Sequence, residues 1–274
     1  MSKPSGAIDM TQSKPINLML RFALPMMIGS IFQSLYSMVD SAVLGRFVGS
    51  HALAAIGATT STTGLILLLA TGVTSAISIA LSQYVGANDT DRVRKGIVAS
   101  GWITLLLGVV LGLISVFAAR PLMQLLKTPE DVIDMSVLYI QIVCGCGIAQ
   151  FAYNAAASIL RALGDSKTPL YFLILCSILN VILDLISVIG LNMGVAGVAV
   201  ATVGSQAISA AICILVMFRK YPDLMPKRHT LRPDMPVSLK IFGMGAQMAL
   251  QSLFLSVGMM VICLLYTSDA ADEL

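Results

Sequence analysis

PLYFLILCSILNVILDLISVIG, residues 169–190, is an apolar run without a Lys or Arg. As an α-helix rising about 1.5 Å per residue, it is long enough to cross the roughly 30 Å hydrocarbon core of a membrane. It nevertheless carries Asn180 and Asp184, one helical turn apart on the same face. Because an uncompensated carboxylate in hydrocarbon costs at least a few kcal/mol, this stretch predicts a membrane helix with a functional polar face.

The rest of the chain has the same character. Its 274 residues are 57% hydrophobic and 11% charged, whereas a soluble domain has about 25% charged residues. This composition excludes an ordinary soluble protein. Long apolar runs predict further spans at 17–43, 52–83, 95–119, 133–160, 195–218 and 237–262. The expected fold is therefore all-α, a polytopic membrane helical bundle.

The basic residues predict the orientation, because cytoplasmic loops are enriched in Lys and Arg. Most of the 17 Lys and Arg fall in the first residues and in every second loop, whereas only Arg46, Arg120 and Lys127 fall on the other side. None is left for the membrane interior. We therefore expect a multi-pass protein of the cell (inner) membrane with a cytoplasmic N-terminus. The residues on the predicted cytoplasmic side are Lys3, Lys14, Arg21, Arg92, Arg94, Lys95, Arg161, Lys167, Arg219, Lys220, Lys227, Arg228, Arg232 and Lys240.

Several functional classes find no support. The net charge of +3 follows from this topology, and no basic patch with interleaved aromatic residues indicates a nucleic-acid partner. His51 and His229, which we expect in loops, have no Glu or Cys at metal-ligand spacing. The cysteines are interpreted as small buried apolar residues. We therefore expect neither an enzyme nor a cofactor.

The chain divides into a cytoplasmic arm (1–16), a six-helix lobe (17–218), a linker (219–236) and the first helix of a second lobe (237–262). FQSLYSMVD at 32–40 and LQSLFLSVG at 250–258 share several positions, which suggests two parallel repeats. Residues 263–274 leave the apolar pattern, and CLLYTSDAADE resembles a translated sequencing adapter. We expect this tail to be non-native and the natural protein to continue beyond Ile262.

The predicted topology places several polar groups at similar depth. Asp40 lies near the outer end of the first span, Asp184 lies about two turns from the outer end of the fifth, and Thr202 lies about two turns into the sixth. Asn180 lies about one turn deeper. These side chains could therefore meet in one cavity in the outer half of the lobe.

Two polar stripes at helical spacing support such a cavity: Gln33, Tyr36, Ser37 and Asp40, and Thr202, Ser205, Gln206 and Ser209. Because the sequence predicts no Lys or Arg inside the membrane, a proton or a bound cation such as sodium should neutralise the aspartates. The alternative is that Asp40 lies at the interface and Asp184 is a hydrogen-bonded packing residue, with Asn180 and Thr202 forming an interhelical hydrogen bond.

Two further features concern helix shape and packing. Pro25 lies inside the first span, where it removes a backbone hydrogen bond and predicts a kink that either gates the cavity or only helps packing. Gly108 and Gly112 form a GxxxG pattern, which predicts close helix packing.

The chain resembles the multidrug and toxic compound extrusion (MATE) family over residues 17–262. The resemblance is carried by LPMMIGSIFQSLYSMVDSAVLGRFVGSHALAAIG at 24–57, RALGDSKTP at 161–169 and NVILD at 180–184. It implies a monomeric full-length transporter of two six-helix lobes that exports small amphiphilic or cationic substrates by antiport against protons or sodium.

The resemblance also implies roles for individual residues. It assigns the cation site, for a proton or sodium, to Asp40, Asn180, Asp184 and Thr202, with Tyr36 in the associated network. Gln33, Ser37, Ser205 and Gln206 are expected to support the site, and Pro25 corresponds to the proline of the first span. The alternatives are a flippase for lipid-linked intermediates, which should have a more cationic cavity, and a non-transporting membrane protein.

Overall fold

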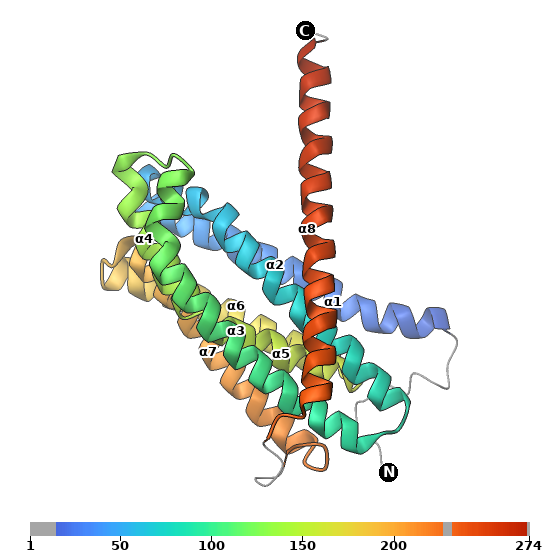
Figure 1. The fold of residues 1–274 in the computed structure, drawn as a ribbon. Helices are drawn as coiled ribbons and strands as arrows, with labels where there is room; N and C mark the ends of the chain where they lie inside the picture. The colour runs from blue at the N-terminus through green and yellow to red at the C-terminus, as the bar shows by residue number, and fades with distance from the viewer. Residues whose placement is uncertain (1–14, 227–231, 273–274) are drawn as a thin grey trace.

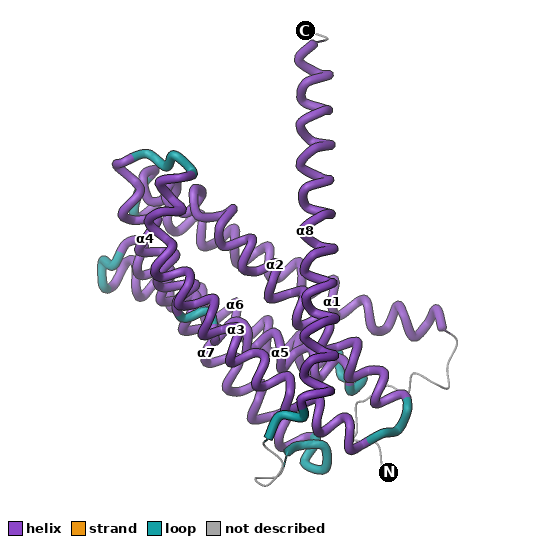
Figure 2. Tube along the Cα trace, in the orientation of Figure 1, coloured by secondary structure: helices purple, strands orange, loops and turns teal. Residues whose placement is uncertain are grey.

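The computed structural model describes the backbone of residues 15–226 and 232–272. Side chains are described for residues 23–226, 232–256 and 258. These residues form helices joined by short loops (Figure 2), which confirms the predicted all-α fold. The elements are α1 (Pro15–Phe47), α2 (Ser50–Gly86), α3 (Thr90–Leu125), α4 (Glu130–Gly145), α5 (Ile148–Ala162), α6 (Lys167–Asp184), the π-helix η1 (Leu185–Gly190), α7 (Gly194–Lys220) and α8 (Met235–Asp272).

Four helical segments of the described chain are long and apolar enough to cross a membrane, namely α2, α3, α6 with η1, and α7. The predicted single span 133–160 is instead α4 and α5, which together meet the same criterion but are bent by 43°. The bend falls at Cys146 and Gly147, where Gly147 N donates to Cys144 O at 3.0 Å. The predicted spans 17–43 and 237–262 correspond to α1 and α8, whose described residues do not meet the criterion by themselves.

The predicted glycine packing is confirmed. A Cβ added to Gly108 would lie 3.0 Å from Ile148 Cγ1, and one added to Gly112 would lie 3.0 Å from Gly145 O. The two glycines of α3 therefore let the α4–α5 bend approach the α3 backbone closely. This contact helps to position α5 beside α2, α3 and α7, where the largest buried apolar cluster lies.

Polar contacts show which loops share an end of the bundle. At one end, Arg94 Nε donates to Asp223 O at 2.9 Å and Lys95 Nζ lies 3.3 Å from Asp234 Oδ2, which joins the start of α3 to the segment between α7 and α8. The loop between α5 and α6 belongs to the same end, because Lys220 contacts it. We call this the basic end.

The opposite end carries an ion pair between Arg120 and Asp134 and a contact of 3.0 Å between His51 Nδ1 and Asp131 Oδ2. His51 was predicted in a loop but lies in the first turn of α2, because the preceding Gly49, with φ of +111°, lets the helix begin at Ser50. Lys3, Lys14, Lys227, Arg228 and His229 lie outside the described residues.

Helix α8 packs only its first half against the rest of the chain and then extends beyond the bundle (Figure 1). Its close contact is with α2, where a Cβ on Gly72 would lie 2.7 Å from Ala249 N. The helix continues without a break through residues 263–272, which were predicted to be a non-native tail. That prediction concerns the origin of the tail and stays a prediction.

Candidate cation-binding site

Two carboxyl groups meet between α1 and α6. Asp184 is fully buried at the last residue of α6, and Asp40 is half-buried near the end of α1. The two side chains interact electrostatically. Oδ1 of Asp40 and both carboxylate oxygens of Asp184 are buried and have no hydrogen-bond partner among the described residues. The pair therefore presents acceptor atoms to which nothing in the described chain donates.

Asn180 and Thr202 extend this site along α6 and α7. Both are buried, and Asn180 Nδ2 donates to Thr202 Oγ1 at 3.5 Å. Oδ1 of Asn180 is another buried acceptor to which no described residue donates. Ser205 Oγ donates to the backbone carbonyl of Thr202 at 2.9 Å, so it contacts the backbone and not the side chain of this residue. The structure thus brings together Asp40, Asp184 and Thr202, whose predicted depths matched, and Asn180, which was predicted one turn deeper.

A change of helix type occurs at the carboxylate. Regular α-helix ends at Asp184, and the next six residues, Leu185–Gly190, form a π-helix. The wider π turn rotates the residues that follow and leaves the backbone less regularly bonded; such insertions are frequent at functional sites. In this chain the irregular turn directly follows the buried acid.

Tyr139 of α4 is a neighbour that the sequence analysis missed. Its hydroxyl interacts electrostatically with Asp40, Tyr36 and Asp184. Its depth could have been predicted. α4 begins at the end of the bundle that carries Arg120 and Asp134, and Tyr139 lies nine residues, or about 14 Å, along the helix from its start. That depth resembles the depth predicted for Asp40 and Asp184, but the sequence of α4 does not show which neighbouring helix Tyr139 faces.

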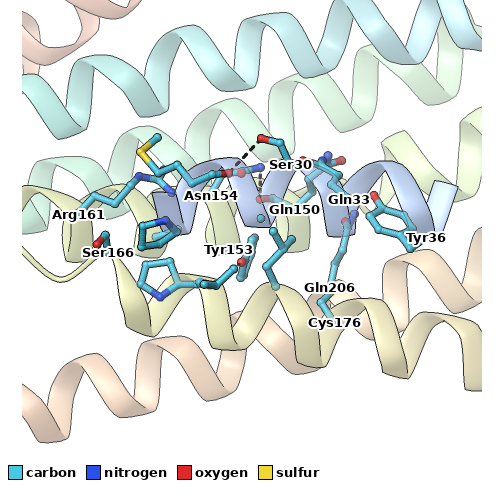
Figure 3. A pocket seen from close by; sticks show the side chains of 17 residues that line it. Ser30, Gln33, Tyr36, Gln150, Tyr153, Asn154, Arg161, Ser166, Cys176 and Gln206 are labelled. Atoms are coloured by element: carbon cyan, nitrogen blue, oxygen red, sulfur yellow. Dashed lines mark hydrogen bonds between the residues drawn. The ribbon is translucent and has the colours of Figure 1, made fainter. Parts of the chain in front are cut away.

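The other predicted residues separate into two groups. Pro25, Gln33, Tyr36 and Gln206 line a cavity of about 220 Å³ bounded by α1, α5, α6 and α7 (Figure 3). Ser37 is exposed and interacts with Tyr36. The predicted supporting residues therefore lie mainly in a neighbouring pocket and not around the carboxylates. We call this space the α1–α6 pocket.

The α1–α6 pocket lies next to the carboxylates. Tyr36, Cys176 and Gln206 line it, and each lies one helical turn from Asp40, Asn180 or Thr202 on the same helix. The full lining is Pro25, Met26, Gly29, Ser30, Gln33, Tyr36, Gln150, Tyr153, Asn154, Ala157, Arg161, Ser166, Pro169, Leu170, Leu173, Cys176 and Gln206.

The oxygen atoms around the two carboxylates are suitable ligands for a hard cation or a proton. At the carboxylates, the buried atoms for which no described residue supplies a hydrogen-bond partner are oxygens of Asp40, Asn180 and Asp184, and oxygen ligands favour hard cations over thiophilic metals. No three His, Cys, Asp or Glu side chains come together within the described parts of the chain. A proton shared between the carboxyls, or one sodium ion among these oxygens, would supply the missing partner.

Comparisons with known proteins agree with the fold. The probable multidrug resistance protein YpnP of Bacillus subtilis is 31% identical over 258 residues, which cover 93% of this chain and 57% of that protein. A structure described as the outward-facing conformation of a multidrug resistance MATE family transporter of the MOP superfamily superposes with a TM-score of 0.84 at 26% identity, over 90% of this chain and 55% of that one.

A MATE structure in a bent conformation superposes with a TM-score of 0.83 at 25% identity, again over 90% of this chain and 55% of that one. The chain thus spans little more than half the length of the relatives it matches. The profile of the MatE family matches residues 25–186, which include Asp40, Asn180 and Asp184. This chain belongs to the MatE family.

Proposed function

We propose that this chain forms one lobe of a secondary active exporter that moves small amphiphilic or cationic compounds out of the cell in exchange for protons or sodium. Asp40, Asn180, Asp184 and Thr202 bind the coupling cation. No enzymatic step and no cofactor is part of the proposal. YpnP and the superposed outward-facing structure support it, because both are described as multidrug resistance proteins.

One observation carries the proposal. Asp184 is fully buried and both its carboxylate oxygens lack a donor, while the carboxyl of Asp40 lies close enough to repel it. Intramembrane carboxylates are costly and are usually retained for ion pathways and proton relays. A pair of this kind is relieved by a proton or by a cation, so its occupancy can be linked to a gradient.

The coupling step follows from this charge balance. With the site empty, repulsion between Asp40 and Asp184 favours separation of α1 and α6, and a bound cation or proton favours their approach. The π-helix after Asp184 gives α6 an irregular turn at which such an approach can occur. A cation would thereby bias the lobe between two arrangements, as alternating access requires.

The orientation of the lobe is part of the proposal. The basic end faces the cytoplasm, because cytoplasmic loops are enriched in Lys and Arg, and the N-terminus lies on the same side of the cell membrane. The cation site is then in the outer half of the lobe. We expect the full-length transporter to be a monomer, surrounded by lipid and without a nucleic-acid partner.

The test is Asp184→Asn in the full-length transporter that contains this lobe. An amide nearly matches the carboxylate in shape but neither exchanges a proton near neutral pH nor offers a cation a charge. Insertion should survive, since a neutral side chain costs less in hydrocarbon than a charged one. We expect substrate efflux from proteoliposomes to be lost under imposed proton and sodium gradients alike.

The matched control is Asp134→Asn, which removes an exposed carboxylate that pairs with Arg120 at the end of the bundle away from the basic end. It should export at the parental rate at equal protein density. The double variant Asp40→Asn/Asp184→Asn tests whether Asp40 alone can drive residual transport. Parental export by Asp184→Asn under the gradient that drives the parent would show that Asp184 is a packing residue.

A further inference from the structure

One end of the α1–α6 pocket carries an arginine. Arg161 was predicted to lie in a cytoplasmic loop, but the residue lies in the last turn of α5 and its side chain lines the pocket (Figure 3). Arg161 Nη2 donates to Ser158 Oγ at 2.9 Å. None of the ion pairs found among the described side chains involves Arg161, and the pocket lining contains no Asp or Glu. A guanidinium has five N–H donors, so it retains donors for a ligand.

Ser166 provides a second, independent observation at the same end. It is 5% exposed, and its Oγ is buried without a hydrogen-bond partner among the described residues. Ser166 is the N-cap residue of α6, yet its side chain makes no capping bond to the helix. In Figure 3 Ser166 and Arg161 lie at the same end of the pocket. A buried hydroxyl without a partner is costly, and an acidic ligand beside Arg161 would accept its hydrogen.

The nearby acid does not neutralise this end. Asp165 precedes Ser166, but its Oδ2 accepts from Lys220 Nζ at 2.7 Å and from Thr168 Oγ1 at 2.6 Å. Because Lys220 balances Asp165, no carboxylate of the described residues pairs with Arg161. The N-terminus of α6, with its positive helix dipole, lies at the same place and adds to the preference for an anion.

The remainder of the pocket suits an amphiphilic body. Met26, Leu170 and Leu173 contribute apolar surface, while Gln150 and Asn154 contribute amides. From Pro25 to Tyr36 the pocket follows about 16 Å of α1. Figure 3 shows Arg161 at one end and Tyr36 at the other, so an elongated molecule can lie along the pocket with one end toward each.

We propose that the α1–α6 pocket binds a small amphiphile with an acidic end group, which Arg161 and Ser166 hold at the basic end. The body of the ligand lies against α1 and α6 and points toward Tyr36, one turn from Asp40. A zwitterion would fit in this direction, with its cationic end toward the carboxylate pair. The role of the pocket in export rests on the proposed function, but binding does not, since it needs neither a gradient nor a second lobe.

The test uses two matched probes, 4-(4-fluorophenyl)butyrate and its primary amide, which differ in charge and hardly in shape. Binding to this chain in detergent is followed by fluorine NMR, with empty micelles as the blank. We expect the wild-type chain to bind the carboxylate at least tenfold more tightly than the amide, because hydrogen bonds to a charged group are the stronger ones. Equal affinity for the two probes would overturn the proposal, whatever the variants show.

The variants locate the site. Arg161→Gln should lose the preference for the carboxylate and leave the affinity for the amide unchanged, and Arg161→Lys should keep part of the preference. Ser166→Ala should weaken carboxylate binding about three- to tenfold. The control Arg219→Gln removes an exposed arginine from the last turn of α7 and should change nothing. A preference for the carboxylate that survives Arg161→Gln would place the acid elsewhere and refute the assignment.

Discussion

The buried ion pair at the basic end gives a prediction whose size follows from its contacts. Asp165 is 2% exposed. Its Oδ2 accepts from Lys220 Nζ at 2.7 Å and from Thr168 Oγ1 at 2.6 Å, and its Oδ1 accepts from Thr168 N at 3.1 Å. These bonds tie the α5–α6 loop to the first turn of α6 and to the end of α7. The perturbation is Asp165→Asn, which keeps the shape and removes the charge.

The expected loss is about 2 to 4 kcal/mol. Removing one partner of a buried pair costs about 3 to 5 kcal/mol, because the other charge remains without compensation. The expected loss lies about 1 kcal/mol below that range, because the Lys220 side chain is 26% exposed and can be partly hydrated. At about 2 to 4 °C per kcal/mol for a chain of this size, the unfolding midpoint should fall by roughly 4 to 16 °C.

A thiol-reactive fluorescent dye in detergent can measure this midpoint, because Cys144, Cys176 and Cys213 are buried in the folded chain and react once it opens. The control Asp134→Asn breaks an exposed ion pair of 3.0 Å with Arg120. Exposed pairs contribute little, so this midpoint should shift by less than about 2 °C. Equal shifts for the two variants would refute the argument that burial sets the size of the effect.

The same pair has a defined pH dependence. Burial raises the pKa of the Asp165 carboxyl, but bonds from Lys220 and Thr168 outweigh it and hold the pKa below its ordinary value. A depressed pKa contributes stability that is present above the unfolded value of about 3.9 and is lost as the pH falls through the folded value. The difference in midpoint between wild type and Asp165→Asn should therefore be constant near neutral pH and shrink below about pH 4. A difference that grew on acidification would contradict the assigned sign.

Three further outcomes are expected. Gly72→Ala should lower the unfolding midpoint, because the added Cβ would lie 2.7 Å from Ala249 N. Gly64→Ala should leave the midpoint unchanged or raise it slightly, because nothing lies within 4 Å of the added Cβ. The reverse order of the two midpoints would contradict the close α2–α8 contact. Tyr139→Phe should weaken binding of the coupling cation several-fold without moving the midpoint, as measured by radioactive sodium binding or proton release in detergent; unchanged binding would remove Tyr139 from the site. Asp40→Asn should weaken the same binding, and wild-type binding in this variant would leave Asp184 as the only charged ligand.

Much of the candidate site could be predicted from sequence. Helical rise converts residue number into depth, and the basic loops give each helix a direction. These two rules were enough to place Asp40, Asp184 and Thr202 at one level, with Asn180 a turn away. The structure brings these residues together between α1, α6 and α7, although their role as a cation site stays a proposal.

The same rules failed where side-chain neighbours decide the outcome. Gln33 and Gln206 share helical stripes with the site residues, yet they line the adjacent pocket. A stripe shows which residues share a face, but it does not show which other helix that face meets. Tyr139 was missed for the same reason. Ser136 lies one turn before it and marks a buried face of α4, but the sequence does not show which helices that face meets.

The sequence by itself determined the all-α fold class and the four spans that became α2, α3, α6 with η1, and α7, because apolar length depends on local composition. Only the tertiary structure decided the bend between α4 and α5. The apolar run does not show that the helix breaks near Gly147, where Gly145 and Ile148 pack against the glycines of α3. It also decided that Arg161 faces a pocket and that no described residue hydrogen-bonds the Ser166 hydroxyl. Burial and hydrogen-bond satisfaction are properties of helices brought together from distant parts of the chain, so no single stretch of sequence contains them.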